Sequence, residues 1–387
     1  FKQKTAYEIK ECDWSSDVCS SDLAPILILG ATGPWDATQR RPWIDWIHTS
    51  SDQGGLIRNF TKWDNQPGSP AAAQEALLRA SQIAQTAPRG PVYINLEVKM
   101  QEQKIGAMPP LPDAARFQVP PMVRPAPELV AQAAKLLSSA KNPVILAGRA
   151  SRSMTGWNER IALAEKLDAP VLSSIKLAAA FPTTHRLHPI PPFQGLPKSA
   201  AALIKSADVI LALDWLDLAG TFKQAYGGEA IGAKVIHVSC DAHSHRGWSA
   251  DYQGLPPADV YMLCETDAVV PLLLEACAKR KSSVALPAKP ALPPVPDAVS
   301  LRTVAVALEE ATRGVAVSYT RLPLGWNGGY TQFTDPLSYI GHDGGAGVGS
   351  GPGMTVGVGL ALKCSGRVPI CLMGDGDFLM EIGRAHV

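Results

Sequence analysis

The chain has 387 residues, of which 46% are hydrophobic and 18% charged, and its formal net charge is +1. This composition excludes a disordered or collagen-like chain, and no apolar run is long enough to span a bilayer. No basic run indicates nucleic-acid binding, so we expect a globular protein of two or three domains without nucleic-acid or membrane partners.

Both ends of the sequence resemble translated sequencing-adapter sequence rather than protein. Residues 1–23 and 381–387 show no helix or strand periodicity, and we expect both segments to be fusion scars rather than a natural polar terminus. The genuine chain is therefore expected to run from Ala24 to Met380.

Two proline-rich segments, 107–127 and 286–297, divide this chain into three blocks. Proline fixes φ and lacks a backbone donor, so such runs favour extended connectors. The blocks are 24–106, 128–285 and 298–380. We expect each block to be a separate domain.

The first block opens on an apolar strand pattern at 25–30. A helix is predicted at 69–87, with Ser69 as its N-cap and Pro70 in its first turn. A second strand is predicted at 91–98. Strand, helix and strand in this order predict a parallel crossover.

The middle block alternates apolar strand patterns with helical ones. Strands are predicted at 143–148, 170–174, 207–213, 234–239 and 259–264. Helices are predicted at 127–140, 157–169, 198–207 and 266–280. Continuous apolar strands separated by helices predict a doubly wound parallel sheet.

The third block begins with a helix at 298–311 and a strand at 314–320. After a glycine-rich loop come a helix near 354–364, a strand at 368–374 and a turn. So few strands cannot close a doubly wound sheet, and the first block is equally short. The fold class expected is α/β, with three doubly wound parallel-sheet domains of which the first and last are truncated.

Two glycine-containing segments in the third block carry the strongest chemical signal. The loop 344–351 leads into a helix, whose N-terminal amides favour an anion. Gly374-Asp375-Gly376 follows an apolar strand, where ligands bind in open α/β sheets. A carboxylate there suits Mg²⁺, and glycines let backbone amides approach a phosphate. Each segment alone is an ordinary turn, but their order predicts one shared anion site.

These features resemble the thiamine-diphosphate-dependent enzymes that include acetolactate synthase and benzoylformate decarboxylase. Gly347-Val348-Gly349 is similar to the glycine loop of their diphosphate-binding domain, and Gly374-Asp375-Gly376 resembles the start of their metal–diphosphate motif. Arg58, Thr61-Lys62 and 89–98 resemble the second half of their pyrimidine-binding domain, and 181–192 resembles part of their central domain.

The resemblance assigns a role to each matching residue. Asp375 would bind Mg²⁺, the Gly374 and Gly376 backbones would face the diphosphate, and Val348 would hold the cofactor bent. The remaining predicted cofactor contacts are Gly345, Gly347, Gly349 and Asp377.

The resemblance also implies the chemistry, which is decarboxylation of a 2-keto acid followed by release of an aldehyde or by carboligation. The activating glutamate and the asparagine of the metal site are expected outside this chain, so we name no catalytic residue and expect the fragment to be inactive. The family forms its sites between chains, which implies a homodimer or homotetramer. FAD occupancy stays open. The alternative from another class is a non-catalytic nucleotide- or anion-binding α/β protein.

Five cysteines outside the adapter-like segments are odd in number and lie mostly in apolar runs, which indicates buried thiols of a cytoplasmic protein rather than disulfides. They are Cys240, Cys264, Cys277, Cys364 and Cys371.

Two weaker candidate sites in the sequence lack the residues that their chemistry needs. A zinc site at Cys240, Asp241, His243 and His245 lacks a second pair of ligands. Gly148 lacks the other glycines of a dinucleotide fingerprint.

The remaining weaker candidates are histidines and tryptophans. For His185 and His188 a packed loop position is favoured over catalysis, whereas His342-Asp343 directly precedes the glycine loop and could lie near substrate. Three tryptophans are expected in the core or in a subunit contact: Trp35, Trp43 and Trp46.

Overall fold

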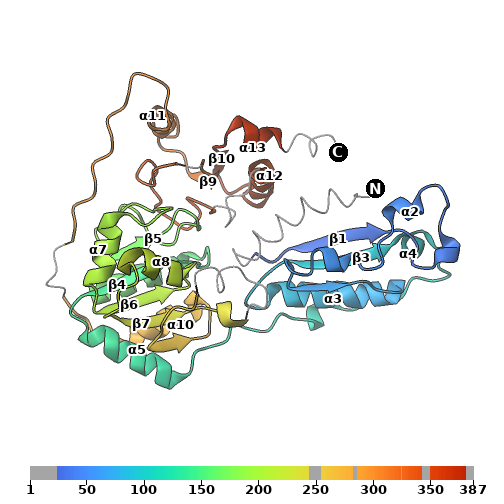
Figure 1. Cartoon of the computed structure of the whole chain (residues 1–387), viewed down its shortest axis with the longest axis horizontal. Helices are drawn as coiled ribbons and strands as arrows, with labels where there is room; N and C mark the ends of the chain where they lie inside the picture. Colours follow the sequence, from blue (N-terminus) through green and yellow to red (C-terminus); the bar gives the residue numbers. More distant parts are fainter. Residues whose placement is uncertain (1–23, 244–253, 282–285, 324, 342–348, 381–387) are drawn as a thin grey trace. The chain divides into compact units, whose positions relative to one another are not determined.

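The computed structural model describes residues 24–243, 254–281, 286–323, 325–341 and 349–380. The chain divides into two compact units, residues 1–122 with 241–248 and residues 123–240 with 249–387. The first unit contains one sheet and the second contains two, and the strand pairs in all three are parallel. The expected α/β class with three parallel sheets is confirmed (Figure 1).

The first unit holds a three-stranded sheet in the order β1-β3-β2. Its strands are β1 (Leu27–Thr32), β2 (Trp63–Asn65) and β3 (Val92–Glu97). Helix α3 (Pro70–Gln85) precedes β3. The parallel pairing of β1 with β3 is confirmed, whereas β2 was not predicted because its sequence, Trp63-Asp64-Asn65, contains no apolar run.

Local sequence explains the packing of α3. The Ser69 side chain accepts a hydrogen bond from the backbone N–H of Ala72, as its predicted N-cap role requires. Three alanines spaced four residues apart face the sheet and are buried with Val92 and Ile94. They are Ala76, Ala80 and Ala84.

The unit also contains short helical turns: η1 (Ala37–Gln39), α2 (Asp45–His48), η2 (Gly54–Leu56), α4 (Val98–Glu102) and η3 (Ala114–Arg116).

The second unit contains the five-stranded sheet predicted from the middle block. Its order is β5-β4-β6-β7-β8. The strands are β4 (Pro143–Ala147), β5 (Val171–Ser173), β6 (Val209–Leu213), β7 (Lys234–Val238) and β8 (Val260–Met262). The helices are α5 (Pro127–Ser139), α6 (Met154–Leu167), α7 (Lys198–Ser206), α8 (Leu218–Tyr226) and α10 (Thr266–Ala276), and η4 (Asp241–His243) follows β7.

Alternate residues of each strand point to opposite faces of this sheet, and each face has its own core. Ile145 packs among residues of α5, α6 and α10, whereas its neighbour Leu146 packs among residues of α7 and α8. Both faces are therefore covered by helices, as expected for a doubly wound sheet. The sequence missed α8, a nine-residue helix that contains Gly220 and Thr221 and begins at Leu218, after the N-cap Asp217.

The second unit also holds a two-stranded parallel sheet of β9 (Val317–Arg321) and β10 (Val368–Cys371). Its helices are α11 (Leu301–Ala311), α12 (Gly351–Ala361) and α13 (Asp375–Leu379). The predicted turn at Asp375 is wrong in detail, because Gly374 is the N-cap of α13 and Asp375 is its first residue. Of the two predicted connectors, 107–127 contains η3 and ends on Pro127, the first residue of α5, and 286–297 contains no helix or strand.

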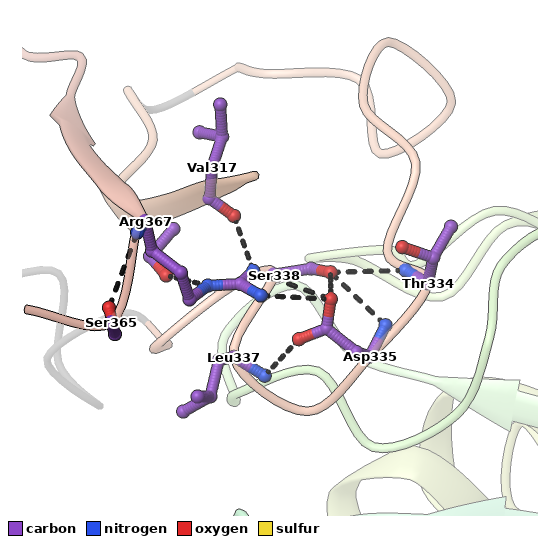
Figure 2. Close-up of polar contacts among 8 residues, drawn as sticks. Val317, Thr334, Asp335, Leu337, Ser338, Ser365 and Arg367 are labelled. Carbon is purple, nitrogen blue, oxygen red and sulfur yellow. Dashed lines mark hydrogen bonds and ion pairs between the residues drawn. The ribbon is translucent and has the colours of Figure 1, made fainter. Parts of the chain in front are cut away.

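Figure 2 shows how the loop 334–338 is tied to the start of β9. The Arg367 guanidinium donates to the carbonyl oxygen of Val317 at 2.6 Å and contacts Asp335 Oδ2 at 3.3 Å. Asp335 Oδ1 accepts from the backbone N–H of Leu337 at 2.8 Å. Because Val317 begins β9, this cluster fixes the amino end of the sheet, opposite the end where the sequence places the anion site.

Two sequence expectations need correction. Trp35, Trp43 and Trp46 are 59%, 70% and 69% exposed, so their assignment to the core is wrong, and a subunit contact stays a prediction. Cys364 is exposed rather than buried, because it follows the end of α12 in a turn with φ of 70°. No helix in the described ranges is both long and apolar enough to cross a membrane.

Candidate functional site

The candidate site lies at the carboxyl ends of β9 and β10. Helix α12 begins there at Gly351, directly after the described end of the glycine loop. A Cβ atom at Gly351 would lie 2.9 Å from Cδ of Arg321 and 2.9 Å from Cε of Met373. Only glycine therefore lets the start of α12 lie this close to the ends of both strands.

A polar network joins the glycine loop to α13. The backbone N–H of Gly349 donates to Oδ1 of Asp377, and Oδ2 of Asp377 lies 2.7 Å from Nε of Arg321. Arg321 also donates to the hydroxyl of Ser350 at 2.8 Å. The side chains of Arg321 and Asp377 are only 5% and 12% exposed. Gly349 and Asp377, which are 28 residues apart in sequence, are thus held side by side at one sheet edge.

The structure brings some of the predicted site residues together and leaves others undescribed. Gly349 and Asp377 are in direct contact. Asp375 is exposed at the start of α13, and no side-chain partner is found for it in the described ranges. Gly345, Gly347 and Val348 lie outside the described residues, as do His342 and Asp343.

The backbone around Asp375 is open on the side where a ligand would approach. A Cβ atom built on Gly374 or Gly376 would meet no atom within 4 Å. An exposed carboxylate between two open glycines offers a hard oxygen ligand and accessible amides, which is the donor set that Mg²⁺ and a phosphate require. The eleven-residue α12 directs its first amides to the same edge. The described residues therefore fit a metal-bridged diphosphate.

Sequence reasoning missed Arg321 and Ser350, which organise this edge. The predicted strand ended at residue 320, one position before Arg321. The available signal was a cation directly after an apolar strand, in the position where a parallel sheet presents its ligand-binding residues.

The histidine candidates have packing roles. His188 is 1% exposed, and its Nε2 lies 2.8 Å from the hydroxyl of Ser173. Burial lowers the pKa of His188 to about 3, so this imidazole is neutral at pH 7. His185 contacts Glu165 at 3.1 Å.

The zinc and dinucleotide candidates gain no support from the described residues. Burial raises the pKa of the Cys240 thiol to about 12, which disfavours the thiolate that zinc needs. His245 lies outside the described residues, and within them no three His, Cys, Asp or Glu side chains form a metal-binding group. A Cβ atom at Gly148 would lie 2.1 Å from the Asp214 carbonyl oxygen, so this glycine is required for packing.

Comparison with known protein families decides between these interpretations. Residues 130–251 match the family described as "Thiamine pyrophosphate enzyme, central domain". Residues 324–386 match "Thiamine pyrophosphate enzyme, C-terminal TPP binding domain". The chain therefore contains regions that match two domains of thiamine pyrophosphate enzymes. The Gly349–Asp377 contact lies within the second match, and the five-stranded sheet lies largely within the first.

Similar proteins agree with this assignment. The chain is 39% identical over 166 residues to a probable sulfoacetaldehyde acetyltransferase of Rhizobium meliloti (strain 1021), a match that covers 42% of the chain and 26% of the relative. It is 27% identical over 356 residues to a benzoylformate decarboxylase of Pseudomonas aeruginosa, covering 84% of the chain and 60% of that relative.

The fold of this family is also recognisable in solved structures. The crystal structure of benzoylformate decarboxylase from Polynucleobacter necessarius superimposes with a TM-score of 0.76 at 21% identity, and the match covers 97% of the chain and 68% of that structure. At this identity the likeness shows the three-domain fold alone.

Proposed function

We propose that the chain is part of a thiamine-diphosphate- and Mg²⁺-dependent enzyme that acts on 2-keto acids by decarboxylation or carboligation. The observation that supports the proposal is the contact between Gly349 and Asp377, which lies two residues from the exposed Asp375. The family match supports this function over the alternative of a non-catalytic nucleotide- or anion-binding protein.

Each group at the sheet edge has a proposed task. Asp375 binds Mg²⁺, and the Gly374 and Gly376 backbones face the diphosphate. Gly345, Gly347 and Val348 are proposed cofactor contacts from the sequence resemblance. Asp377 positions the glycine loop and does not touch the cofactor itself, because its carboxylate is already bound by the Gly349 amide and the Arg321 guanidinium.

Thiamine diphosphate, when bound, supplies a carbon nucleophile and an electron sink for the loss of carbon dioxide. The chain's own contribution is positioning. Arg321 neutralises Asp377 and binds Ser350, so the start of α12 stays against the strand ends while its amides face the anion. Turnover by this chain alone, its cytoplasmic location and its assembly as a homodimer or homotetramer stay predictions from the sequence.

The first test is Mg²⁺-dependent stabilisation of the purified chain by thiamine diphosphate. A ligand that binds only the folded state stabilises it by about 2.7 kcal/mol at a concentration 100 times Kd. We expect a rise of several degrees in Tm with thiamine diphosphate and MgCl₂ together, and a much smaller rise with EDTA. An equal rise produced by ADP in place of thiamine diphosphate would instead indicate a generic anion-binding protein.

A second candidate function rests on the 39% identity to a probable sulfoacetaldehyde acetyltransferase. Sulfoacetaldehyde, the compound in that relative's name, is a small aldehyde with a sulfonate group, whereas a 2-keto acid has a carboxylate group. Both are small carbonyl compounds with one anionic end group. Assaying the intact enzyme with each compound distinguishes the two candidates.

A further inference from the structure

The first unit contains a pocket of about 210 Å³ that none of the predicted roles uses. It lies at the carboxyl end of β1, where Thr32 and Gly33 form part of its wall. Trp35, Arg40 and Ser50 from the following turns complete much of the lining. Ligands of open α/β sheets bind at this end of the strands.

Arg40 is the cationic group of the pocket. Its Nε donates to the Pro34 carbonyl oxygen at 2.9 Å and its Nη2 to the Trp35 carbonyl oxygen at 3.4 Å. Both bonds go to neutral backbone acceptors, and we find no carboxylate bound to Arg40 in the ranges that the structure describes. The guanidinium is thus held in place by two neutral acceptors, and the nearby Asp36 carboxylate interacts with its charge.

The neighbouring carboxylates are already bound by other groups. Arg41 forms a 2.8 Å ion pair with Asp45 and holds the pKa of that carboxyl below its usual value. Thr38 binds Asp36 at 2.8 Å through its hydroxyl and likewise lowers the pKa of Asp36. The charge of Arg40 also acts on Asp36, but the hydrogen bonds found for Arg40 in the described ranges go to backbone oxygens. Arg40 is therefore the cation of this turn that we expect to bind an external anion.

The wall beside Arg40 has a fixed shape and carries hydroxyl groups. The Thr32 hydroxyl accepts from the backbone N–H of Ser50 at 3.3 Å, and the Gly33 N–H donates to the His48 carbonyl oxygen at 3.0 Å. A Cβ atom at Gly33 would lie 2.0 Å from the Thr49 hydroxyl, so a larger residue there would displace the Thr49 side chain. The Ser50 hydroxyl adds a donor to the lining.

We propose that this pocket binds the anionic end group, carboxylate or sulfonate, of a small carbonyl compound. The proposal rests on the proposed function, because it assigns a binding place to the substrate class named there. A guanidinium binds either oxyanion through two parallel hydrogen bonds, and serine and threonine hydroxyls satisfy the remaining oxygen lone pairs. A volume of about 210 Å³ admits a molecule of pyruvate size and excludes a nucleotide.

The test is a ligand-observed NMR titration of the full chain with pyruvate and with sulfoacetaldehyde, without thiamine diphosphate or Mg²⁺. We expect at least one of the two anions to bind, and Arg40→Gln to weaken its affinity by about 10-fold because a charge-assisted bond is lost. Ser50→Ala removes one donor and weakens binding about 3-fold, which gives a second variant that keeps the cation. If only one of the two anions binds, the result shows whether the pocket takes a carboxylate or a sulfonate.

Arg79→Gln is the matched control, because Arg79 is exposed on α3 of the same unit and outside the pocket. This variant keeps the wild-type affinity. Three results would overturn the proposal: unchanged affinity in Arg40→Gln, equally tight binding of uncharged pyruvamide, or binding of inorganic phosphate with neither organic anion. If an organic anion binds but thiamine diphosphate does not stabilise the chain, the cofactor assignment fails while the pocket stands.

Discussion

Replacement of Arg149 by methionine should lower the free energy of unfolding by about 3–5 kcal/mol, because it leaves the Asp214 carboxylate buried without its partner. The two side chains are 7% and 6% exposed, and Arg149 contacts Asp214 through Nη2 at 2.8 Å and Nε at 3.0 Å. Urea unfolding followed by far-UV circular dichroism measures the loss.

The position of this pair explains the size of the effect. Arg149 follows β4 and Asp214 follows β6, two neighbouring strands at the centre of the five-stranded sheet. The double variant Arg149→Met/Asp214→Asn removes the unpaired charge as well, so it should recover part of the loss.

An exposed ion pair of the same unit provides the control. Arg186 contacts Asp168 at 2.8 Å, but its side chain is 62% exposed. Arg186→Met should therefore change the free energy of unfolding by less than about 1 kcal/mol. Similar losses in the Arg149 and Arg186 variants would contradict the buried-pair account.

Acid should destabilise the second unit through His188. The pKa of this imidazole is lowered from 6.5 to about 3, first by burial and then by the charge of Lys289. The unfolded chain therefore binds this proton at a higher pH than the folded chain. The stabilisation is complete above pH 6.5 and is lost as the pH falls toward 3, by about 1.4 kcal/mol per pH unit.

The His188→Gln variant isolates this contribution from the carboxylates that also titrate in acid. Glutamine keeps a polar group near the Ser173 hydroxyl, which His188 contacts at 2.8 Å, but it does not titrate. Between pH 6 and pH 5, wild type should lose about 1 kcal/mol more than the variant in urea titrations. Equal losses in the two proteins would show that folded His188 takes up its proton over the same pH range as the unfolded chain.

The central sheet was predictable because its strands are continuous apolar runs between helices. Val144–Leu146 and Ile210–Ala212 are buried on both faces of the sheet, and such runs are detected without knowledge of the tertiary structure. Strand β2 and helix α8 carry no comparable pattern, because β2 contains Asp64 and Asn65 and α8 contains glycine and threonine. Their positions depend on the elements they pack against.

The site was predictable in location but not in detail. The order of glycine loop, helix, strand and Asp375 indicated one sheet edge, and Gly349 and Asp377 do meet there. Arg321 could not be assigned from sequence, since its partners Ser350 and Asp377 are 29 or more residues away along the chain. The exposed Trp43 shows a second limit of sequence-based prediction, because an aromatic residue type alone does not indicate that the side chain is buried.

The central claim is that Asp375 and the glycine-rich edge bind one Mg²⁺-bridged diphosphate. Isothermal titration of the full chain with thiamine diphosphate in MgCl₂ tests this claim most directly, with Asp375→Asn as the variant. Asp297→Asn, an exposed aspartate in the proline-rich connector, is the control. We predict Mg²⁺-dependent binding in wild type and in the control, and affinity reduced at least about 10-fold in Asp375→Asn. Equal affinity for thiamine diphosphate in all three proteins, or the same affinity with and without Mg²⁺, would contradict the account.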